Sequence, residues 1–211
     1  QSGELITTLA GHTEWISTLA FSPDGQVLVS GSGDNTTQFW NTQTFGLINK
    51  IEGAVNSLAY SVDGQQLAIG QRNGVQLLNA ESFAPLKTLQ CHSYDVNTIA
   101  FQPNGKALAL GADDGSIRLW STRAEHTVNI LKGHSDELSA LAYSPNGNVI
   151  ASGSSDQAVR LWDVQSGHVI NSQTTTSDEV GPLCFSPDGK VIALYTEDNP
   201  IELWDAHTLK S

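Results

Sequence analysis

Short apolar segments alternate with polar turn residues along all 211 residues, and one pattern returns five times. Each unit starts with an apolar segment that ends in an aromatic residue, for example ISTLAF at 16–21 and LSALAY at 138–143. A phrase such as SPDG or SPNG follows, in which Pro presets φ, Asp or Asn accepts local backbone hydrogen bonds and Gly adopts positive φ. The pattern predicts that every unit begins with a strand that reverses at a tight turn.

The turn glycines define the period of the repeat. They are separated by 39, 41, 42 and 42 residues, and they are Gly25, Gly64, Gly105, Gly147 and Gly189. After each glycine come two more apolar segments, joined by a hairpin rich in Asp, Asn and Gly, and then a looser fourth segment. The segments are apolar on both faces and show no helical periodicity, so we expect an all-β fold of four-stranded sheets stacked on one another.

The repeat also carries short motifs at fixed places. These are Gly11-His12, Gly133-His134, Trp162-Asp163, Trp204-Asp205 and the five turns. In this pattern the sequence resembles the WD-repeat β-propeller family, in which each period of about 40–45 residues forms one four-stranded blade. The resemblance covers the whole chain and implies a single β-propeller domain of five WD-type blades over residues 1–211. The expected repeats are approximately 10–50, 51–89, 90–131, 132–173 and 174–211, with 1–9 as a closing strand.

The two ends of the sequence match complementary parts of the repeat. The first residues, QSGELITTL, are similar to the fourth-strand segments, whereas the last unit ends after a third strand. In the resembled family a terminal strand often completes the last blade, so we expect residues 3–9 to pair with residues 200–205 and close the ring. The alternative is part of a larger, seven-bladed propeller, the usual number in that family. The absence of methionine, even at position 1, leads us to expect a processed product or a piece of a longer chain.

Charge and cysteine content narrow the function classes. Ten Lys and Arg against 22 Asp and Glu give a net charge of −12, which repels nucleic acid and anionic lipid, and the basic residues form no patch. No apolar run reaches the length of a membrane span. Cys91 and Cys184 fall at different points of the repeat, which fits neither a disulfide framework nor a metal site. We expect a cytoplasmic protein that binds no cofactor, metal, nucleic acid or membrane.

Ser, His, Asp and Trp recur together at matching places in the first and fourth repeats. The two sets are His12, Ser30, Asp34 and Trp40, and His134, Ser152, Asp156 and Trp162. A nucleophile, a base and an orienting acid are present in each, but a catalytic triad is needed once, beside a pocket and an oxyanion hole. The sets instead follow the period of the fold. The resemblance implies a buried hydrogen-bonded tetrad that stabilises each blade, so we predict a structural role and no catalysis.

The tetrad is incomplete in the other repeats. The third keeps His92, Asp114 and Trp120, and the fifth keeps Asp198 and Trp204. The second has lost all four members. We therefore expect the second blade to be the least rigid.

One set of loop residues is a candidate partner-binding surface. In the resembled family the loops before each first strand and the hairpins between strands two and three lie at one mouth of the ring. The residues at these places are Trp15, Asp95, Glu137, Glu179, Asp113 and Glu197. One aromatic residue among five carboxylates suits a basic peptide or protein. The other interpretation is that acidic loops keep a repeat protein soluble.

These observations favour a non-catalytic scaffold that presents a rigid surface to a protein partner. One alternative is a ligand-sensing or autoinhibitory regulatory module of a larger multidomain protein. A less favoured alternative is a propeller enzyme that uses the central channel, which requires convergent titratable groups in a pocket. If the acidic mouth is not the binding face, the opposite mouth with the five turns, or the irregular second blade, is the next candidate.

Overall fold

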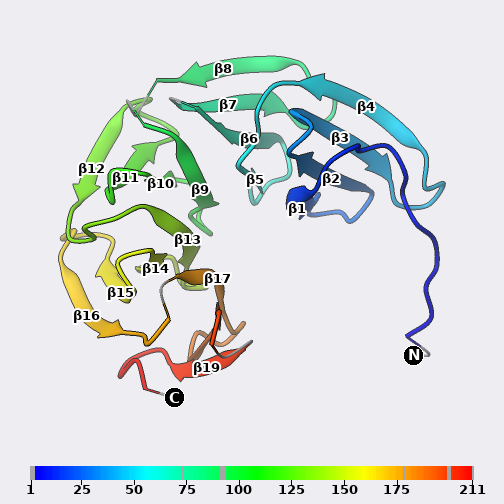
Figure 1. Cartoon of the computed structure of the whole chain (residues 1–211). Helices are drawn as coiled ribbons and strands as arrows, with labels where there is room; N and C mark the ends of the chain where they lie inside the picture. Colours follow the sequence, from blue (N-terminus) through cyan, green and yellow to red (C-terminus); the bar gives the residue numbers. More distant parts are fainter. Residues whose placement is uncertain (1–2, 73, 91–93, 178, 199–200, 211) are drawn as a thin grey trace.

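The computed structural model describes residues 3–72, 74–90, 94–177, 179–198 and 201–210. Within these ranges the chain folds into strands and turns with no helix, and the strands follow one another as five antiparallel sheets. Figure 1 shows the five sheets arranged side by side on an arc around a common centre, each sheet being one blade. None of the described residues form a helix that is long and apolar enough to cross a membrane.

Four blades have four strands and the fifth has three among the described residues. The first blade contains β1 (Ile16–Phe21), β2 (Val27–Ser32), β3 (Thr36–Asn41) and β4 (Leu47–Glu52). The second contains β5 (Ser57–Tyr60), β6 (Gln66–Gln71), β7 (Gly74–Asn79) and β8 (Pro85–Leu89). The third contains β9 (Val96–Phe101), β10 (Ala107–Ala112), β11 (Ile117–Ser121) and β12 (Thr127–Leu131). The fourth contains β13 (Leu138–Tyr143), β14 (Val149–Ser154), β15 (Ala158–Asp163) and β16 (Val169–Thr174). The fifth contains β17 (Val180–Phe185), β18 (Val191–Thr196) and β19 (Glu202–Asp205).

The turn between the first two strands of a blade is held by the Asp or Asn side chain and the glycine of the repeated phrase. In the first blade the Asp24 carboxylate accepts hydrogen bonds from the Ser22 hydroxyl at 2.6 Å and the Gln26 amide at 3.0 Å. Gly25 has φ of 71°, a left-handed conformation that favours glycine. The other four turn glycines have φ of 70–72°. Every first strand therefore reverses at the same edge of its blade.

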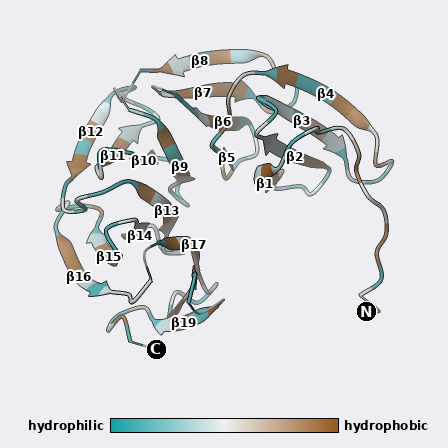
Figure 2. Cartoon of the chain, in the orientation of Figure 1, coloured by the Kyte–Doolittle hydropathy of each residue, from teal (hydrophilic) through white to brown (hydrophobic). Residues whose placement is uncertain are grey.

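The core lies between consecutive blades. Four clusters of buried apolar side chains join the first blade to the second, the second to the third, the third to the fourth and the fourth to the fifth. At the first junction Val29 and Phe39 of one blade contact Leu58 and Ile69 of the next. In Figure 2 the inner strands carry hydrophobic colours, whereas the outermost strands alternate with hydrophilic ones. We call the face of a blade that is turned toward the following blade its C-side face, and the opposite one its N-side face.

The predicted all-β propeller of five WD-type blades is confirmed, but the predicted closing strand is wrong. Residues 3–10 form no strand, and β17, β18 and β19 make a sheet without a fourth member among the described residues. Leu5 and Ile6 are 83% and 82% exposed. One reason is distance, because the first and last blades stand apart in Figure 1. The other is that His12, just after this N-terminal segment, is bound to Ser30 and Asp34 of the first blade.

Candidate functional site

The fourth blade holds a connected set of buried polar side chains. Trp162 Nε1 donates a hydrogen bond to the Ser152 hydroxyl at 2.8 Å. The same hydroxyl lies 2.7 Å from His134 Nε2, and His134 Nδ1 lies 2.9 Å from a carboxylate oxygen of Asp156. The Ser135 amide also donates to Asp156 at 3.0 Å, so the loop before β13 is tied to the hairpin between β14 and β15. Each member thus has a partner, as burial requires.

The first blade repeats this geometry. Trp40 Nε1 donates to the Ser30 hydroxyl at 2.8 Å, and this hydroxyl lies 2.7 Å from His12 Nε2. His12 Nδ1 lies 2.9 Å from Asp34. Asp34 also accepts hydrogen bonds from the hydroxyl and the amide of Thr36, at 2.7 and 3.0 Å, which fixes the hairpin between β2 and β3.

Burial and protonation set the chemistry of the tetrads. Burial lowers the pKa of His134 to about 4, against the opposing effect of the Asp156 carboxylate, so the imidazole is neutral at pH 7. Burial works to raise the pKa of Asp156, but hydrogen bonds from His134 and the Ser135 amide, together with Arg160, lower it below its usual value. The tautomer that satisfies both neighbours has the Nδ1 proton directed to Asp156, and Nε2 accepts the Ser152 proton.

This arrangement leaves no place for a substrate. Ser152 and Trp162 are fully buried, and the indole N–H already occupies the hydroxyl oxygen that would have to attack. A nucleophile must reach both a substrate and an oxyanion hole. The geometry therefore supports the structural interpretation of the two sets.

Sequence reasoning missed one residue of the network, which precedes the tryptophan by two positions. In the fourth blade it is Arg160, whose guanidinium contacts His134 and donates to Asp156 at 2.8 Å. In the fifth blade it is Glu202, which accepts the Trp204 indole hydrogen bond at 2.8 Å. Alternation along a strand places residues i and i+2 on one face, and this signal could have identified the position.

The incomplete tetrads use other partners. Asp114 of the third blade accepts a hydrogen bond from the Ser116 hydroxyl at 2.6 Å and lies 3.8 Å from Arg118. In the fifth blade the Ser177 hydroxyl donates to Asp198 at 3.1 Å. His92 of the predicted third set lies outside the described residues.

The candidate partner-binding residues lie at the edge of the blades that carries the hairpins between strands two and three. Because antiparallel strands return to this edge, the loop before each first strand lies beside the hairpin of the same blade. Backbone hydrogen bonds join them, from Gly33 to Trp15 at 2.9 Å, from Asp113 to Asp95 at 3.2 Å and from Ser155 to Glu137 at 3.1 Å. We call this the hairpin edge, and the opposite edge, which carries the Asp/Asn-Gly turns, the turn edge.

Trp15 is the exposed aromatic residue of the hairpin edge. Its side chain is 68% exposed although it is large and apolar. The indole rests on Gly33, where a methyl group would lie 2.7 Å from Nε1. The absence of a side chain at Gly33 therefore lets the ring lie close to the hairpin, while most of its surface stays accessible.

The carboxylates of the hairpin edge are held by neighbouring side chains to different degrees. Asp95 lies 3.5 Å from Arg72 of the second blade, and Asp113 accepts a hydrogen bond from Asn97 at 2.7 Å. Glu137 accepts one from Ser155 at 3.3 Å. Glu179 and Glu197 are exposed. The structure places the members of one blade together, while those of different blades form an acidic rim along the arc.

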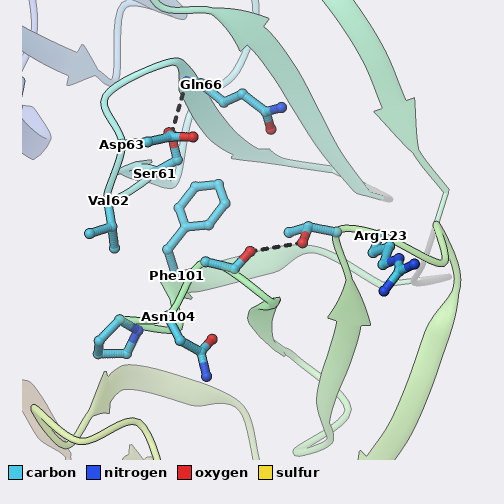
Figure 3. A pocket seen from close by; sticks show the side chains of 10 residues that line it. Ser61, Val62, Asp63, Gln66, Phe101, Asn104 and Arg123 are labelled. Atoms are coloured by element: carbon cyan, nitrogen blue, oxygen red, sulfur yellow. Dashed lines mark hydrogen bonds between the residues drawn. The ribbon is translucent and has the colours of Figure 1, made fainter.

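The turn edge is hollowed between the second and third blades. A pocket of about 510 Å³ lies there, lined among others by Val62, Asp63, Phe101, Asn104 and Arg123. Figure 3 shows the Phe101 ring between the two turns, with Arg123 at the far side of the pocket. The second and third blades thus enclose a concave surface that the sequence did not locate.

Metal ligands are not assembled in the part of the chain that the structure describes. There, no three His, Cys, Asp or Glu side chains gather in a way that would hold a metal ion.

Five similar antiparallel sheets around one centre, two of them with a Trp-Ser-His-Asp network, define a repeat-built β-propeller. The family described as "WD domain, G-beta repeat" matches residues 3–41, 83–121 and 125–163, which together are more than half of the chain. The chain belongs to this WD-repeat family.

Named relatives match part of the chain. A guanine nucleotide-binding protein subunit beta of Nicotiana plumbaginifolia is 29% identical over 135 residues, which are 58% of this chain and 36% of that protein. WD repeat-containing protein SL1-17 of Schistosoma mansoni is 34% identical over 127 residues, 58% of this chain and 42% of that protein. Small ribosomal subunit protein RACK1y of Oryza sativa subsp. japonica is 32% identical over 128 residues, 58% and 38% respectively. The matched stretch thus spans less than half of the length of each of these relatives.

Proposed function

We propose that the chain is a non-catalytic interaction module whose hairpin edge binds a basic peptide segment of a protein partner. The observation that carries the proposal is Trp15, a large apolar side chain that is 68% exposed, lies against Gly33 and is located at the edge that bears the carboxylates. An exposed aromatic ring attracts Lys and Arg through cation–π interactions, and carboxylates along the same edge attract them by charge. Glu137 and Glu179, on neighbouring blades, would receive further cationic groups.

The named relatives are consistent with a role in assemblies. The words "subunit" and "complex subunit" occur in the names of the guanine nucleotide-binding protein subunit beta and of the target of rapamycin complex subunit wat1 of Schizosaccharomyces pombe. The second is 35% identical over 111 residues, 49% of this chain and 35% of that protein. A rigid propeller with variable loops is suited to hold partners in an assembly.

The proposal is tested with immobilised peptides that alternate Lys or Arg with apolar residues, and with acidic peptides of the same length. We expect binding of the basic set only. Trp15→Ala should raise the dissociation rate about tenfold or more, as loss of an aromatic anchor does. Neutralising Asp95, Glu137 and Glu179 together as Asn, Gln and Gln should slow association and flatten its salt dependence, because rim charges act mainly on encounter.

A matched control removes the same charge elsewhere. Glu81, Glu125 and Asp188 are exposed carboxylates at the turn edge, and their replacement by Gln, Gln and Asn changes the net charge equally. Association of this variant should keep most of its rate. Equal slowing in both triple variants would show that overall charge, and not the hairpin edge, attracts the peptide.

A second candidate surface is the turn-edge pocket between the second and third blades, which is favoured by the apolar Phe101 ring inside it. Asn104→Ala and Arg123→Ala alter its rim, and both residues are exposed. If a partner binds the hairpin-edge variants as well as the wild type but loses affinity with these two, the turn edge is the binding face.

A further inference from the structure

The four internal junctions share a glycine at the contact between the two blades. Each of the first four blades has a glycine on its second strand, and the first residue of the next blade's apolar segment lies over it. The facing pairs are Gly31 and Val55, Gly70 and Val96, Gly111 and Leu138, and Gly153 and Val180. A methyl group at Gly153 would lie 2.6 Å from Cγ1 of Val180, and one at Gly31 would lie 2.7 Å from Cγ1 of Val55. At Gly31, Gly111 and Gly153 the glycine therefore leaves a space that an aliphatic side chain of the next blade fills. At Gly70 the nearest atom is the Val96 carbonyl oxygen, which would lie 3.2 Å from an added methyl group.

The fifth blade has Tyr195 where the other blades have this glycine. Tyr195 precedes Thr196, which pairs with Val180, just as Gly153 precedes Ser154, which pairs with Leu138. Its ring lies over Gly181, where a methyl group would be 2.5 Å from Cδ1 of Tyr195. The aromatic ring thus fills the space that the glycine leaves open in the other blades. In the fifth blade the glycine is instead Gly181, on the adjacent strand β17, and it makes room for the ring.

The rest of this C-side face is apolar and uncovered. Cys184, Ala193 and Leu203 pair across β17, β18 and β19 on the same face as Tyr195. Leu203 is 62% exposed, whereas Leu161, which has the same place in the fourth blade, is 2% exposed. Tyr195 is 44% exposed and Cys184 is exposed as well. The face therefore has the apolar character of an internal junction without its cover.

The first blade of this chain does not fit that face. Ile16 occupies the place of Val55, Val96, Leu138 and Val180, since it pairs with Ser32 as Leu138 pairs with Ser154. Ile16 opposite Tyr195 would bring two large side chains to a point where the internal junctions have one large side chain and a glycine, and closely packed interiors do not admit both. Closure of five blades on themselves and head-to-tail contact with a second copy are both disfavoured for this reason.

We propose that the C-side face of the fifth blade is an interface for a further WD-type blade that has glycine, alanine or serine at the position facing Tyr195. The four internal junctions show what covers a face of this kind, namely the first strand of another blade together with apolar side chains of its next two strands. Tyr195 specifies the side chain that this blade must lack. The interface does not involve the acidic hairpin edge. The proposal can therefore be confirmed or refuted whether or not the hairpin edge binds a basic peptide.

The test appends a copy of residues 127–173, a fourth strand followed by a complete blade, after Ser211 of the full chain. The copy either keeps its Leu138 or carries Leu138→Gly, and each version is made with Tyr195 and with Tyr195→Gly. The readout is the alkylation rate of Cys184 in a Cys91→Ser background. We expect the rate to fall about tenfold or more for Tyr195 with the Gly copy and for Tyr195→Gly with the Leu copy, and less than about twofold for the two mismatched combinations.

Circular dichroism and thermal unfolding confirm that the four proteins are folded. The same alkylation rate in all four proteins would overturn the proposal. So would a rate that depends only on the residue in the appended copy and not on the residue at position 195.

A second measurement needs no added blade. The unextended chain should sediment as a monomer, whereas Tyr195→Gly, which opens the hole for Ile16, should associate head to tail. Association of the unsubstituted chain through this face, detected as slower alkylation of Cys184 at higher concentration, would show that a second copy is the occupant and would also overturn it.

Discussion

A single serine hydroxyl organises each complete tetrad. Ser152 receives the Trp162 indole proton and lies at hydrogen-bond distance from His134, so three elements of the blade meet at one oxygen atom. Arg160 then adds a cation beside Asp156. Because every member is buried or nearly so, removing one leaves its partners without hydrogen bonds in a place that water does not reach.

Trp162→Phe should lower the free energy of unfolding by more than the loss of ring volume alone. The added polar cost is about 1–3 kcal/mol, because the Ser152 oxygen loses its donor. Trp120→Phe is the matched control, since Leu110 occupies the place of the serine in that blade. Urea unfolding of both variants gives the difference. Equal losses in the two variants, or a hydrolase activity that Ser152→Ala abolishes, would contradict a structural tetrad.

Acidification should destabilise the protein through His134. Its pKa of about 4 in the folded state lies below the unfolded value of about 6.5, so between these values the unfolded chain binds more protons. The contribution is fully present above about pH 6.5 and is lost as the pH falls toward 4, on the order of 3 kcal/mol in total. Urea midpoints from pH 7 to 4.5 should fall steeply for the wild type and less steeply for His134→Gln. His126→Gln, at an exposed position, should retain the wild-type slope.

At the level of whole elements, the blades differ in what holds them. The fourth blade has a complete tetrad and buried clusters on both faces. The second blade also lies between two clusters, but β5 is short, with four residues, and Ile69 and Leu78 occupy two tetrad positions. The fifth blade has an open face. Packing alone supports the second blade, whereas packing and polar anchoring support the fourth.

Amide hydrogen exchange should follow this order. We expect the fastest exchange in β17–β19, and among the second, third and fourth blades the fastest in β5–β8. The slowest should be β13–β16, whose loop and hairpin are tied by His134 and Asp156. Mass spectrometry of proteolytic peptides resolves the blades. Equal protection of β5–β8 and β13–β16 would mean that the tetrad adds nothing to local stability.

At the scale of the whole molecule, the repeat made most of the fold predictable. Turn glycines and the residues that precede them act locally, so β1, β13 and β17 begin or end where the apolar segments do. The closing strand was not predictable in the same way. Whether residues 3–9 reach β19 depends on the distance between the first and last blades, which accumulates over all four junctions and is not encoded in any one segment. Likewise, the turn-edge pocket arises from how two blades fit together, and neither blade's sequence reveals it.

Residues 3–9 do not pair with β19 in the structure. We therefore expect two leucines at similar places in the repeat, Leu9 and Leu131, to contribute very differently to stability. Leu9 precedes Gly11 by two residues as Leu131 precedes Gly133, so both belong to fourth-strand segments by sequence. Leu131 is buried in β12 and in the junction between the third and fourth blades, whereas Leu9 is only partly buried and lies in no strand. Leu131→Ala should therefore cost about 2–5 kcal/mol, the range for a large-to-small core substitution. Leu9→Ala should cost less than about 1 kcal/mol, as substitutions away from the core do. Both are measured by urea unfolding at pH 7. A loss at Leu9 as large as that at Leu131 would mean that the N-terminal segment pairs as a fourth strand in solution, and that the first and last blades approach each other more closely than the arc in Figure 1 shows.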